Sequence, residues 1–470
     1  MQSLSNHCTR NNGTRSLLLQ VAGLLALLLA LTGCQGIRAP GETEAQRQLA
    51  EIRAKYRPQN QTPALPALAT NSPFSNFVAY AVLNHPQVAA AYFDWAASVQ
   101  TITAARSLPD PQLTFESDIS TIVSSIMPGL MMTFPGPGKL KAAGAAASAE
   151  STAKYFTFQS AVLQSAYDLK SAYYDLYFLD AQLNIDRQTL ALLADLETIA
   201  RSQNEVGKAT LQDVLRAQLE QDRTANELTN LEDSRRLLMA RFKAALGIPF
   251  SQPDPPPPQN FDSTALDLSP DQLLAEAFAH NPNLRSMEAE VLRAEAQIRV
   301  ASKERIPDTT VGLQADVKAS PVFYRPQLAV TLPIWRDKLK ADLAAAQSGK
   351  SAAQARLSAA QISLAVDFAE KSFNYREASR NLAVAEEQLL PKGRLSLQVA
   401  RAAYLSGQQD FLNLIDAERA LLDIQLAEVQ ARIAREKSLA DISLLILGRA
   451  PAGSPILTNS VSPFADKSQP

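Results

Sequence analysis

Apolar residues recur at heptad spacing over a long stretch of the chain, which is typical of helices that pack along their whole length. Residues 139 to about 203 contain no proline and a single glycine. Within them, apolar residues recur at every seventh position, at Val162, Leu169, Leu176, Leu183 and Leu190. This spacing predicts a coiled-coil helix, and roughly 65 residues at 1.5 Å each would make a rod of about 100 Å. Gly207 then interrupts the pattern, and a second helix is predicted from about 209 to 245.

The second half of the chain has the same organisation. We predict a long helix from 338 to about 405, a turn at Gly407 and a further helix to Leu447. Pro391 lies inside the long helix, where it predicts a kink or a break.

Four short segments between the helices alternate apolar and mostly polar residues, which predicts β-strands. They lie around Leu113 and Phe115, at 130–134, at 311–317 and at 328–332. An apolar face with a period of two over about 10 residues is the signature of a transmembrane β-strand. A half-buried hairpin of a soluble protein remains the alternative interpretation.

These elements belong to a tandem duplication. Leu108-Pro109-Asp110 recurs as Ile306-Pro307-Asp308, and the strand segment at 130–135 recurs at 328–333, both at an offset of 198 residues. Across the repeat the offset drifts only from 196 to 201. Each copy reads as a helix, a pair of strands, a long helix, a turn and a helix.

The repeat divides the chain into six segments. A proline-rich stretch after the first copy, from Pro249 to Pro258, predicts an extended spacer. The predicted segments are a signal peptide at 1–33, a lipidated N-terminal tail at 34–71, the first repeat at 72–248, the proline-rich linker at 249–268, the second repeat at 269–448 and a C-terminal tail at 449–470.

The N-terminus resembles a secretory signal peptide. Two arginines precede a core of about 15 apolar residues, whereas a membrane-spanning helix needs about 20. The core ends in Leu31-Thr32-Gly33-Cys34, which resembles the bacterial lipobox. That resemblance implies cleavage before Cys34 and lipid attachment to it, and the following Gln35 favours the outer membrane over the inner one. No later window offers 18 uncharged apolar residues for another spanning helix.

Composition excludes several classes of function. The chain has 45 basic and 47 acidic residues, which argues against nucleic-acid binding. Three scattered histidines, and two cysteines that both lie within the first 34 residues, cannot build a histidine-rich or cysteine-ligated metal site. No nucleophile-elbow, phosphate-loop, HExxH or paired-cysteine motif is present. We therefore expect neither an enzyme nor a bound cofactor or metal.

Four strands are too few to close a transmembrane barrel, which needs about eight. The chain must therefore associate with copies of itself if these strands span a membrane. A dimer would give eight strands around a filled interior, whereas a trimer would give twelve and leave a lumen.

This combination resembles the TolC-like outer-membrane efflux channels, specifically their lipoprotein branch. The resemblance covers about 72–448, and it rests on the duplicated unit and on its two glycine turns. It implies a mainly α fold with a β-barrel portion, in which a homotrimer forms a 12-strand barrel and an α-helical tunnel. It also implies a lipid-anchored protein of a Gram-negative outer membrane with its tunnel in the periplasm, acting with a periplasmic adaptor and an inner-membrane pump of the resistance-nodulation-division type. The segment 134–139 is similar to a heavy-metal-exporter subgroup, so heavy-metal cations join drugs as candidate substrates.

The same resemblance assigns functions to the two turns. It implies adaptor docking at Val206, Gly207, Ser406 and Gly407. It implies a gate that involves Asp213, Tyr404, Gln409, Asn413 and Asp416, in which Gln409 stands where the family pattern has an arginine. Three copies of Asp416 would form a carboxylate ring that favours cations. For these polar residues, solvated helix surface is the competing interpretation, and for Tyr404 it is core packing.

Two other non-enzymatic functions compete with the channel. A periplasmic adaptor would carry one helical hairpin between glycine-rich β modules, but this chain has two hairpins and only 17 glycines. A structural coiled-coil lipoprotein of the envelope would account for the helices but not for the strands.

Overall fold

The computed structural model describes residues 38–119, 123–256 and 270–457. An N-terminal segment and the first repeat contain α2 (Glu42–Tyr56), the short helix η1 (Pro58–Asn60), α3 (Phe74–Asn84), α4 (Pro86–Arg106), β1 (Gln112–Ile119), β2 (Val123–Phe134), α5 (Lys139–Glu205) and α6 (Leu211–Ala245). The second repeat contains α7 (Pro270–His280), α8 (Pro282–Lys303), β3 (Asp308–Asp316), β4 (Phe323–Thr331), α9 (Arg336–Val384), η2 (Ala385–Leu389), α10 (Leu390–Leu405), α11 (Phe411–Ala440) and η3 (Asp441–Ile446). The predicted order of elements is therefore confirmed in both copies.

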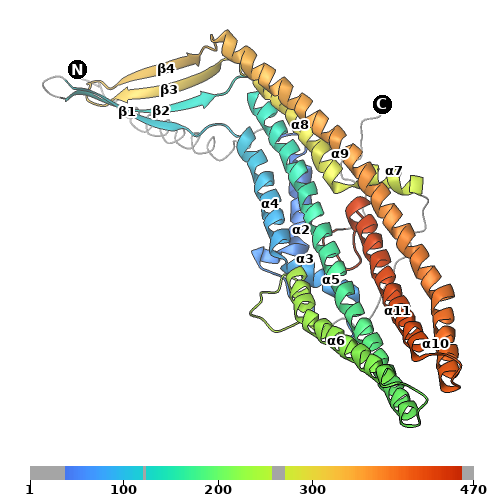
Figure 1. The fold of residues 1–470 in the computed structure, drawn as a ribbon. Helices are drawn as coiled ribbons and strands as arrows, with labels where there is room; N and C mark the ends of the chain where they lie inside the picture. The colour runs from blue at the N-terminus through green and yellow to red at the C-terminus, as the bar shows by residue number, and fades with distance from the viewer. Residues whose placement is uncertain (1–37, 120–122, 257–269, 458–470) are drawn as a thin grey trace, which may run out of the picture.

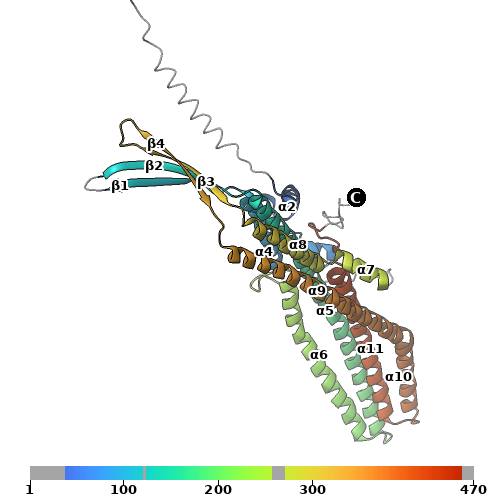
Figure 2. The same cartoon turned by 90° about the horizontal axis from the view of Figure 1, so that it is seen from above.

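The molecule is elongated, with the sheet at one end and two helical hairpins at the other (Figure 1). The α5–α6 and α10–α11 turns lie at the end farthest from the sheet, and we call them the first and second tips (Figure 2). In the described part of the chain, no helix combines the length and the apolarity that a membrane crossing requires.

The four predicted strands form one antiparallel sheet in the order β1-β2-β3-β4. The β2–β3 pairing joins the two repeats, with Leu130 opposite Leu313. Burial alternates along β3, where Leu313 is 51% exposed and the next residue, Gln314, is buried, whereas β4 is exposed almost throughout. One face of the sheet is thus apolar and open to the surroundings, as the period of two predicted.

The heptad pattern of α5 forms a buried seam. Val162, Leu169, Leu176 and Leu183 are each at most 1% exposed, and Leu190 is half-buried. The seam continues into an aromatic core where α2, α3 and α4 pack against α5, and the rings of Trp95 and Phe158 stack there at 5.8 Å. Tertiary packing, not intrinsic propensity, therefore stabilises a helix of 67 residues.

Pro391 changes the direction of the second hairpin without ending its helix. The five residues of η2, just before the proline, are wound as a π-helix, and α10 leaves along a different line from α9 (Figure 2). Proline has no N–H and its ring collides with the carbonyl four residues earlier, so a wider turn relieves the contact. The predicted kink is confirmed, and the chain stays helical through it.

The segments at the edges of the repeats are partly structured. The predicted tail at 34–71 contains α2, which is fixed to α4 by a 2.6 Å ion pair between the fully buried Glu42 and Arg106. The predicted proline-rich linker begins with a turn in which the Gln252 amide donates to the Pro249 carbonyl at 3.1 Å. Residues 257–268 of the predicted linker, the predicted signal peptide and Cys34 lie outside the described residues.

Candidate functional site at the helical tips

Both tips are built on the same glycine turn. Gly207 has a φ of 73° and Gly407 a φ of 72°, in the left-handed region that favours glycine. In each turn the glycine amide donates to the carbonyl three residues earlier, at 2.9 and 3.0 Å. The next amide donates to the carbonyl five residues earlier, at 2.8 and 2.9 Å. This closes each helix in a Schellman-type cap.

The glycines are needed for their backbone conformation and not for space. A Cβ atom at Gly207 or Gly407 would meet nothing within 4 Å. The neighbouring Val206 is 65% exposed, and Ser406 is also exposed. The four residues assigned to adaptor docking therefore lie on open surface at the far end of the molecule.

Asp213 serves as a helix cap at the first tip. Its Oδ2 accepts hydrogen bonds from the Thr210 backbone amide and from the Thr210 hydroxyl, each at 3.0 Å. The Thr210 hydroxyl in turn caps the amide of Asp213, so the pair forms a capping box at the start of α6. A Thr-x-x-Asp pattern carries this local role in the sequence itself, although sequence reasoning placed the residue in a gate.

Tyr404 is a core residue of the second tip. It is 7% exposed, and its ring lies 5.2 Å from that of Phe411. Both belong to a buried group that we call the tip cluster, consisting of Leu193, Leu196, Ala200, Val214, Ala217, Ala400, Tyr404, Phe411, Leu414, Ile415 and Ala417. Burial raises the pKa of Tyr404, and the charge of Asp213 raises it further. Its hydroxyl has no hydrogen-bond partner within the described chain, so Tyr404 and Asp213 are not hydrogen-bonded to each other inside a single copy.

The other three gate candidates lie on the surface. Gln409 is exposed in the second turn, and Asn413 and Asp416 are exposed one helical turn apart on α11. The Asp416 side chain is 58% exposed and lies 3.7 Å from the guanidinium of Arg419. A single chain therefore brings Tyr404 close to Asp213 but leaves Gln409, Asn413 and Asp416 facing outwards.

An ion pair that sequence reasoning missed connects the two hairpins. Glu220 on α6 is 9% exposed, and its carboxylate accepts from Nε of Arg419 on α11 at 3.1 Å and also from Nη2 of the same guanidinium. Arg223, on the same helix as Glu220, donates to it at 3.0 Å. The pKa of Glu220 is lowered chiefly by its hydrogen bonds with Arg419. No local motif signals a pair separated by 199 residues, so only the packing of α6 beside α11 reveals it.

A second carboxylate beside this pair has the opposite shift. Glu418 is 3% exposed, and burial raises its pKa from the ordinary value of 4.5 to about 7. The charges of Glu220 and Asp423 also raise the pKa, whereas Arg419 lowers it. Arg419 thus contacts the Glu220 carboxylate, whose pKa is lowered, and its charge partly offsets the raised pKa of the neighbouring Glu418.

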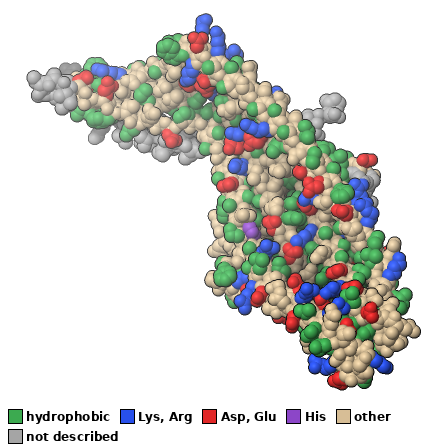
Figure 3. All heavy atoms as spheres, viewed as in Figure 1, with side chains coloured by type: hydrophobic (Ala, Val, Ile, Leu, Met, Phe, Trp, Pro, Cys, Tyr) green, Lys and Arg blue, Asp and Glu red, His purple; other side chains and the backbone are tan. Residues whose placement is uncertain are grey.

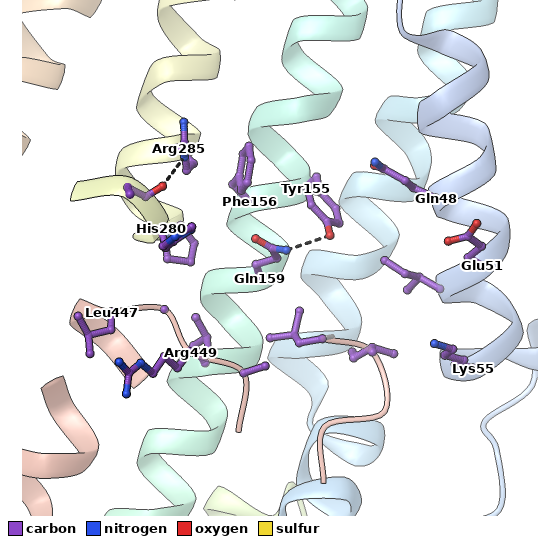
Figure 4. Close-up of a pocket in the computed structure, with 18 of the residues that line it drawn as sticks. Gln48, Glu51, Lys55, Tyr155, Phe156, Gln159, His280, Arg285, Leu447 and Arg449 are labelled. Carbon is purple, nitrogen blue, oxygen red and sulfur yellow. Dashed lines mark hydrogen bonds between the residues drawn. The ribbon is translucent and has the colours of Figure 1, made fainter. Parts of the chain in front are cut away.

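A hollow of about 730 Å³ lies away from the tips, between α2, α5, α7, α8 and the segment after η3 (Figure 4). Its polar side chains mostly have partners: Gln159 donates to the Tyr155 hydroxyl at 2.9 Å, and Arg449 binds Glu276 through two contacts. None of the predicted site residues lines it. Among the described residues, no group of histidine, cysteine, aspartate and glutamate is arranged to hold a metal ion.

Known proteins share this architecture. CusC, whose crystal structures concern folding and transmembrane channel formation, superposes with a TM-score of 0.70 at 17% identity, covering 83% of this chain and 98% of that one. The outer-membrane protein VceC from Vibrio cholerae superposes with a TM-score of 0.68 at 19% identity, covering 80% and 96%. These likenesses establish the fold.

Sequence comparison identifies the family. The pyoverdine export outer membrane protein OpmQ of Pseudomonas putida is 25% identical over 182 residues, which are 35% of this chain. The matched part of this chain spans 38% of the length of OpmQ. The profile of the outer membrane efflux protein family matches residues 78–248 and 273–448, one match for each repeat. Because these matches cover most of the sequence, the chain belongs to the outer membrane efflux protein family and is a protein of the outer membrane.

Proposed function

We propose that this protein is the exit duct of a tripartite efflux pump. In this proposal it passively conducts substrates that a periplasmic adaptor and an inner-membrane transporter, of the resistance-nodulation-division type, deliver to it. The observation that carries the proposal is an open sheet with two free edges, continued by two long helical hairpins. One such chain cannot enclose a pore, but several copies side by side can. The family match favours this duct over the adaptor and the structural lipoprotein.

A homotrimer is the proposed assembly. Three copies would close twelve strands around a lumen, whereas two would leave an interior filled by side chains. Exposed apolar residues support such contacts: hydrophobic side chains appear on the visible face of both the sheet and the helical body (Figure 3). On α6, Leu211, Leu215 and Leu219 form a stripe at a spacing of four, and they are 64%, 50% and 56% exposed. Stripes of this kind on soluble helices are covered by a partner.

The two tips form the proposed periplasmic mouth. Val206, Gly207, Ser406 and Gly407 are proposed to meet the adaptor, since both turns are exposed at the same end of the molecule. The gate is proposed to lie just above them. It includes the predicted Asp213, Tyr404, Gln409, Asn413 and Asp416, with Asp213 and Tyr404 acting through the cap and packing described above.

The transport substrate depends on the partner pump. Heavy-metal cations and drugs are the two classes that the sequence suggests, and the name of OpmQ adds pyoverdine as a third. A deletion strain, profiled for susceptibility to metal salts and drugs and for pyoverdine in the medium, distinguishes these classes.

The duct itself is tested by mass and conductance. Purified in detergent, the protein should have the native mass of three chains, and in planar lipid bilayers it should form ion-conducting pores. A stable single chain that keeps its full β-sheet circular dichroism would refute the proposal.

A further inference from the structure

The junction between the two repeats contains an ionic contact at the base of the sheet. Asp308, the first residue of β3, accepts from the Gly136 amide at 2.7 Å and from Nζ of Lys139 at 3.0 Å. Lys139, the first residue of α5, has a side chain only 13% exposed and also reaches Glu304 at 3.5 Å. The contact fixes the start of β3 against the end of β2, where the strands pass into helices.

The same two residues recur in the other repeat without their partners. Asp110 is the equivalent of Asp308 at an offset of 198, and Lys338 is the equivalent of Lys139 at an offset of 199. Both are exposed, and neither side chain has an ionic or hydrogen-bond partner among the described residues. Asp110 precedes β1 and Lys338 follows β4, so each lies beside a free edge of the sheet.

Those edges are suited to each other. Adjacent strands alternate in direction along the order β1-β2-β3-β4, so β4 would run antiparallel to the β1 of a second copy. Both edges expose apolar side chains: Leu113 and Phe115 are 84% and 72% exposed on β1, and Leu328 and Val330 are 71% and 47% exposed on β4. An unpaired edge of this kind is a template for another strand.

We propose that β4 pairs with β1 of a neighbouring copy in the register of the β2–β3 pair, and that Lys338 binds Asp110 of that copy. The register follows from the repeat offset of 198 residues. Each β2 residue number is increased by 198 to give its equivalent on β4, and each β3 residue number is decreased by 198 to give its equivalent on β1 of the neighbouring copy. The observed pair Met132–Val311 becomes Val330 opposite Leu113 of the neighbouring copy. The inference rests on the proposed trimer and specifies its interface residue by residue.

The alternation of side chains independently supports this register over any slip by an odd number of residues. Leu113, Leu130 and Leu313 form one row across the sheet, and Val330 shares a row with Phe134 through Thr309. Since Leu130 and Phe134 are an even number of residues apart on β2, all these side chains lie on the same face. Placing Val330 opposite Leu113 therefore keeps the apolar face continuous, whereas a slip of one residue would mix the two faces.

One feature of the β2–β3 junction is not reproduced between copies. A Cβ at Gly136 would lie 2.6 Å from Ile306 and 2.7 Å from the Pro307 carbonyl. The equivalent of Gly136 is Ile334, whose side chain would collide in that geometry. We therefore assign the strand register and the lysine–aspartate contact to the interface, but not the glycine amide bond. A head-to-tail contact of this kind forms a closed ring when the rotation that relates neighbouring copies adds up to a full turn.

Disulfide trapping in the full-length protein tests the register. Thr133 and Thr310 lie opposite each other with hydroxyl oxygens 3.0 Å apart, and their equivalents are Thr331 and Gln112. The variant Thr331→Cys with Gln112→Cys should shift, on oxidation, to the masses of two and three linked chains in non-reducing gels. The control Ala329→Cys with Gln112→Cys tests a slip of two residues and should stay at the mass of one chain. The parent chain, whose cysteines both lie in the first 34 residues, gives the background.

Charge exchange tests the ionic contact without disulfide chemistry. Asp110→Lys alone should lower the temperature at which the oligomer dissociates in detergent, and adding Lys338→Asp should restore it. The matched exchange within one chain, Asp308→Lys with Lys139→Asp, should change the unfolding temperature of the chain. It should leave the temperature at which the oligomer dissociates unchanged.

The outcomes separate this inference from the function on which it rests. Disulfide linking of the Ala329→Cys variant in preference to the Thr331→Cys variant would overturn the register and leave the trimer intact. The same conclusion would follow if neither variant formed linked chains and Lys338→Asp did not restore the dissociation temperature, in a protein with the native mass of three chains. A native mass of one chain would overturn the trimer, and the inference with it.

Discussion

The ion pair between Glu220 and Arg419 gives the sharpest test of what holds the proposed mouth closed. It connects α6 of the first hairpin to α11 of the second, and Arg419→Met removes its charge while keeping most of its apolar length. We expect the two hairpins to separate more easily in this variant, which should raise the resting conductance of the pore.

The size of the effect follows from the contacts. Arg419 donates twice to a carboxylate that is 9% exposed, and hydrogen bonds to charged groups contribute about 1.5–3 kcal/mol each. The Arg419 side chain is 43% exposed, so solvent screening lowers the contribution of the pair to about 1–2 kcal/mol. If three copies open together, the loss amounts to about 3–6 kcal/mol, or roughly two to four orders of magnitude in the closed–open equilibrium.

Single-channel recording in planar bilayers measures the effect, and Arg223→Met is the matched control. Arg223 contacts the same carboxylate at 3.0 Å, but it lies on α6 with Glu220 and its side chain is 69% exposed. Removing it should leave the resting conductance unchanged, whereas reversing the charges in Glu220→Arg with Arg419→Glu should return it toward the parent value. If Arg419→Met and Arg223→Met both conduct like the parent, this ion pair does not hold the mouth closed.

Three further predictions concern other parts of the chain. Cys34→Ser should abolish incorporation of radiolabelled palmitate, and normal labelling would place the acyl chain elsewhere; we expect the trimer to be weakened but still formed. Asp416→Asn should lower the preference for cations in bilayer recordings without opening the pore, because it removes an exposed charge and no contact between hairpins; an unchanged reversal potential would exclude a carboxylate ring. Glu418→Gln should remove a pH dependence of the free energy of unfolding. Because the pKa of Glu418 is raised in the folded protein, its contribution to stability is complete below about pH 4.5 and is lost as the pH rises to about 7. The lowered pKa of Glu220 affects stability only at more acidic pH. Thermal unfolding of parent and variant at pH 5 and pH 7.5 measures this, and an equal pH shift in both would contradict it.

The sequence was sufficient for the regular elements because their physical rules are local. An apolar face with a period of two places β1 to β4, and the seam through Val162 and Leu183 places α5. The turns were predictable at Gly207 and Gly407 because a left-handed residue after a helix favours glycine. The repeat strengthened each of these predictions, since a chance pattern does not recur at a nearly constant offset.

The contacts of the candidate site depend instead on how helices lie beside one another. Glu220 and Arg419 are ordinary charged residues on two helix surfaces until α6 packs beside α11 and buries the carboxylate. The burial of Tyr404 also arises from helix packing, because it depends on Phe411 across the turn and on residues of the first hairpin. Asp213 differs, since its partner Thr210 is three residues away and the capping box was legible in the sequence.

The two repeats agree where they build the sheet and differ where they build the tips. Asp110 and Lys338 are the same residue types as Asp308 and Lys139, and the registers of β1–β2 and β3–β4 are related by a single offset of 198 residues. The hairpins do not match in this way: only the second contains a π-helical bend before Pro391, and only the first has a side-chain capping box at its tip. In the proposed ring of copies, closure needs equivalent edges, which accounts for the symmetry of the duplication in the sheet. A mouth that opens needs one hairpin to move against the other, and two identical hairpins would provide no preferred direction. The asymmetry lies at the proposed mouth, and we expect the second hairpin, bent at η2 and held to the first by Arg419, to be the part that moves.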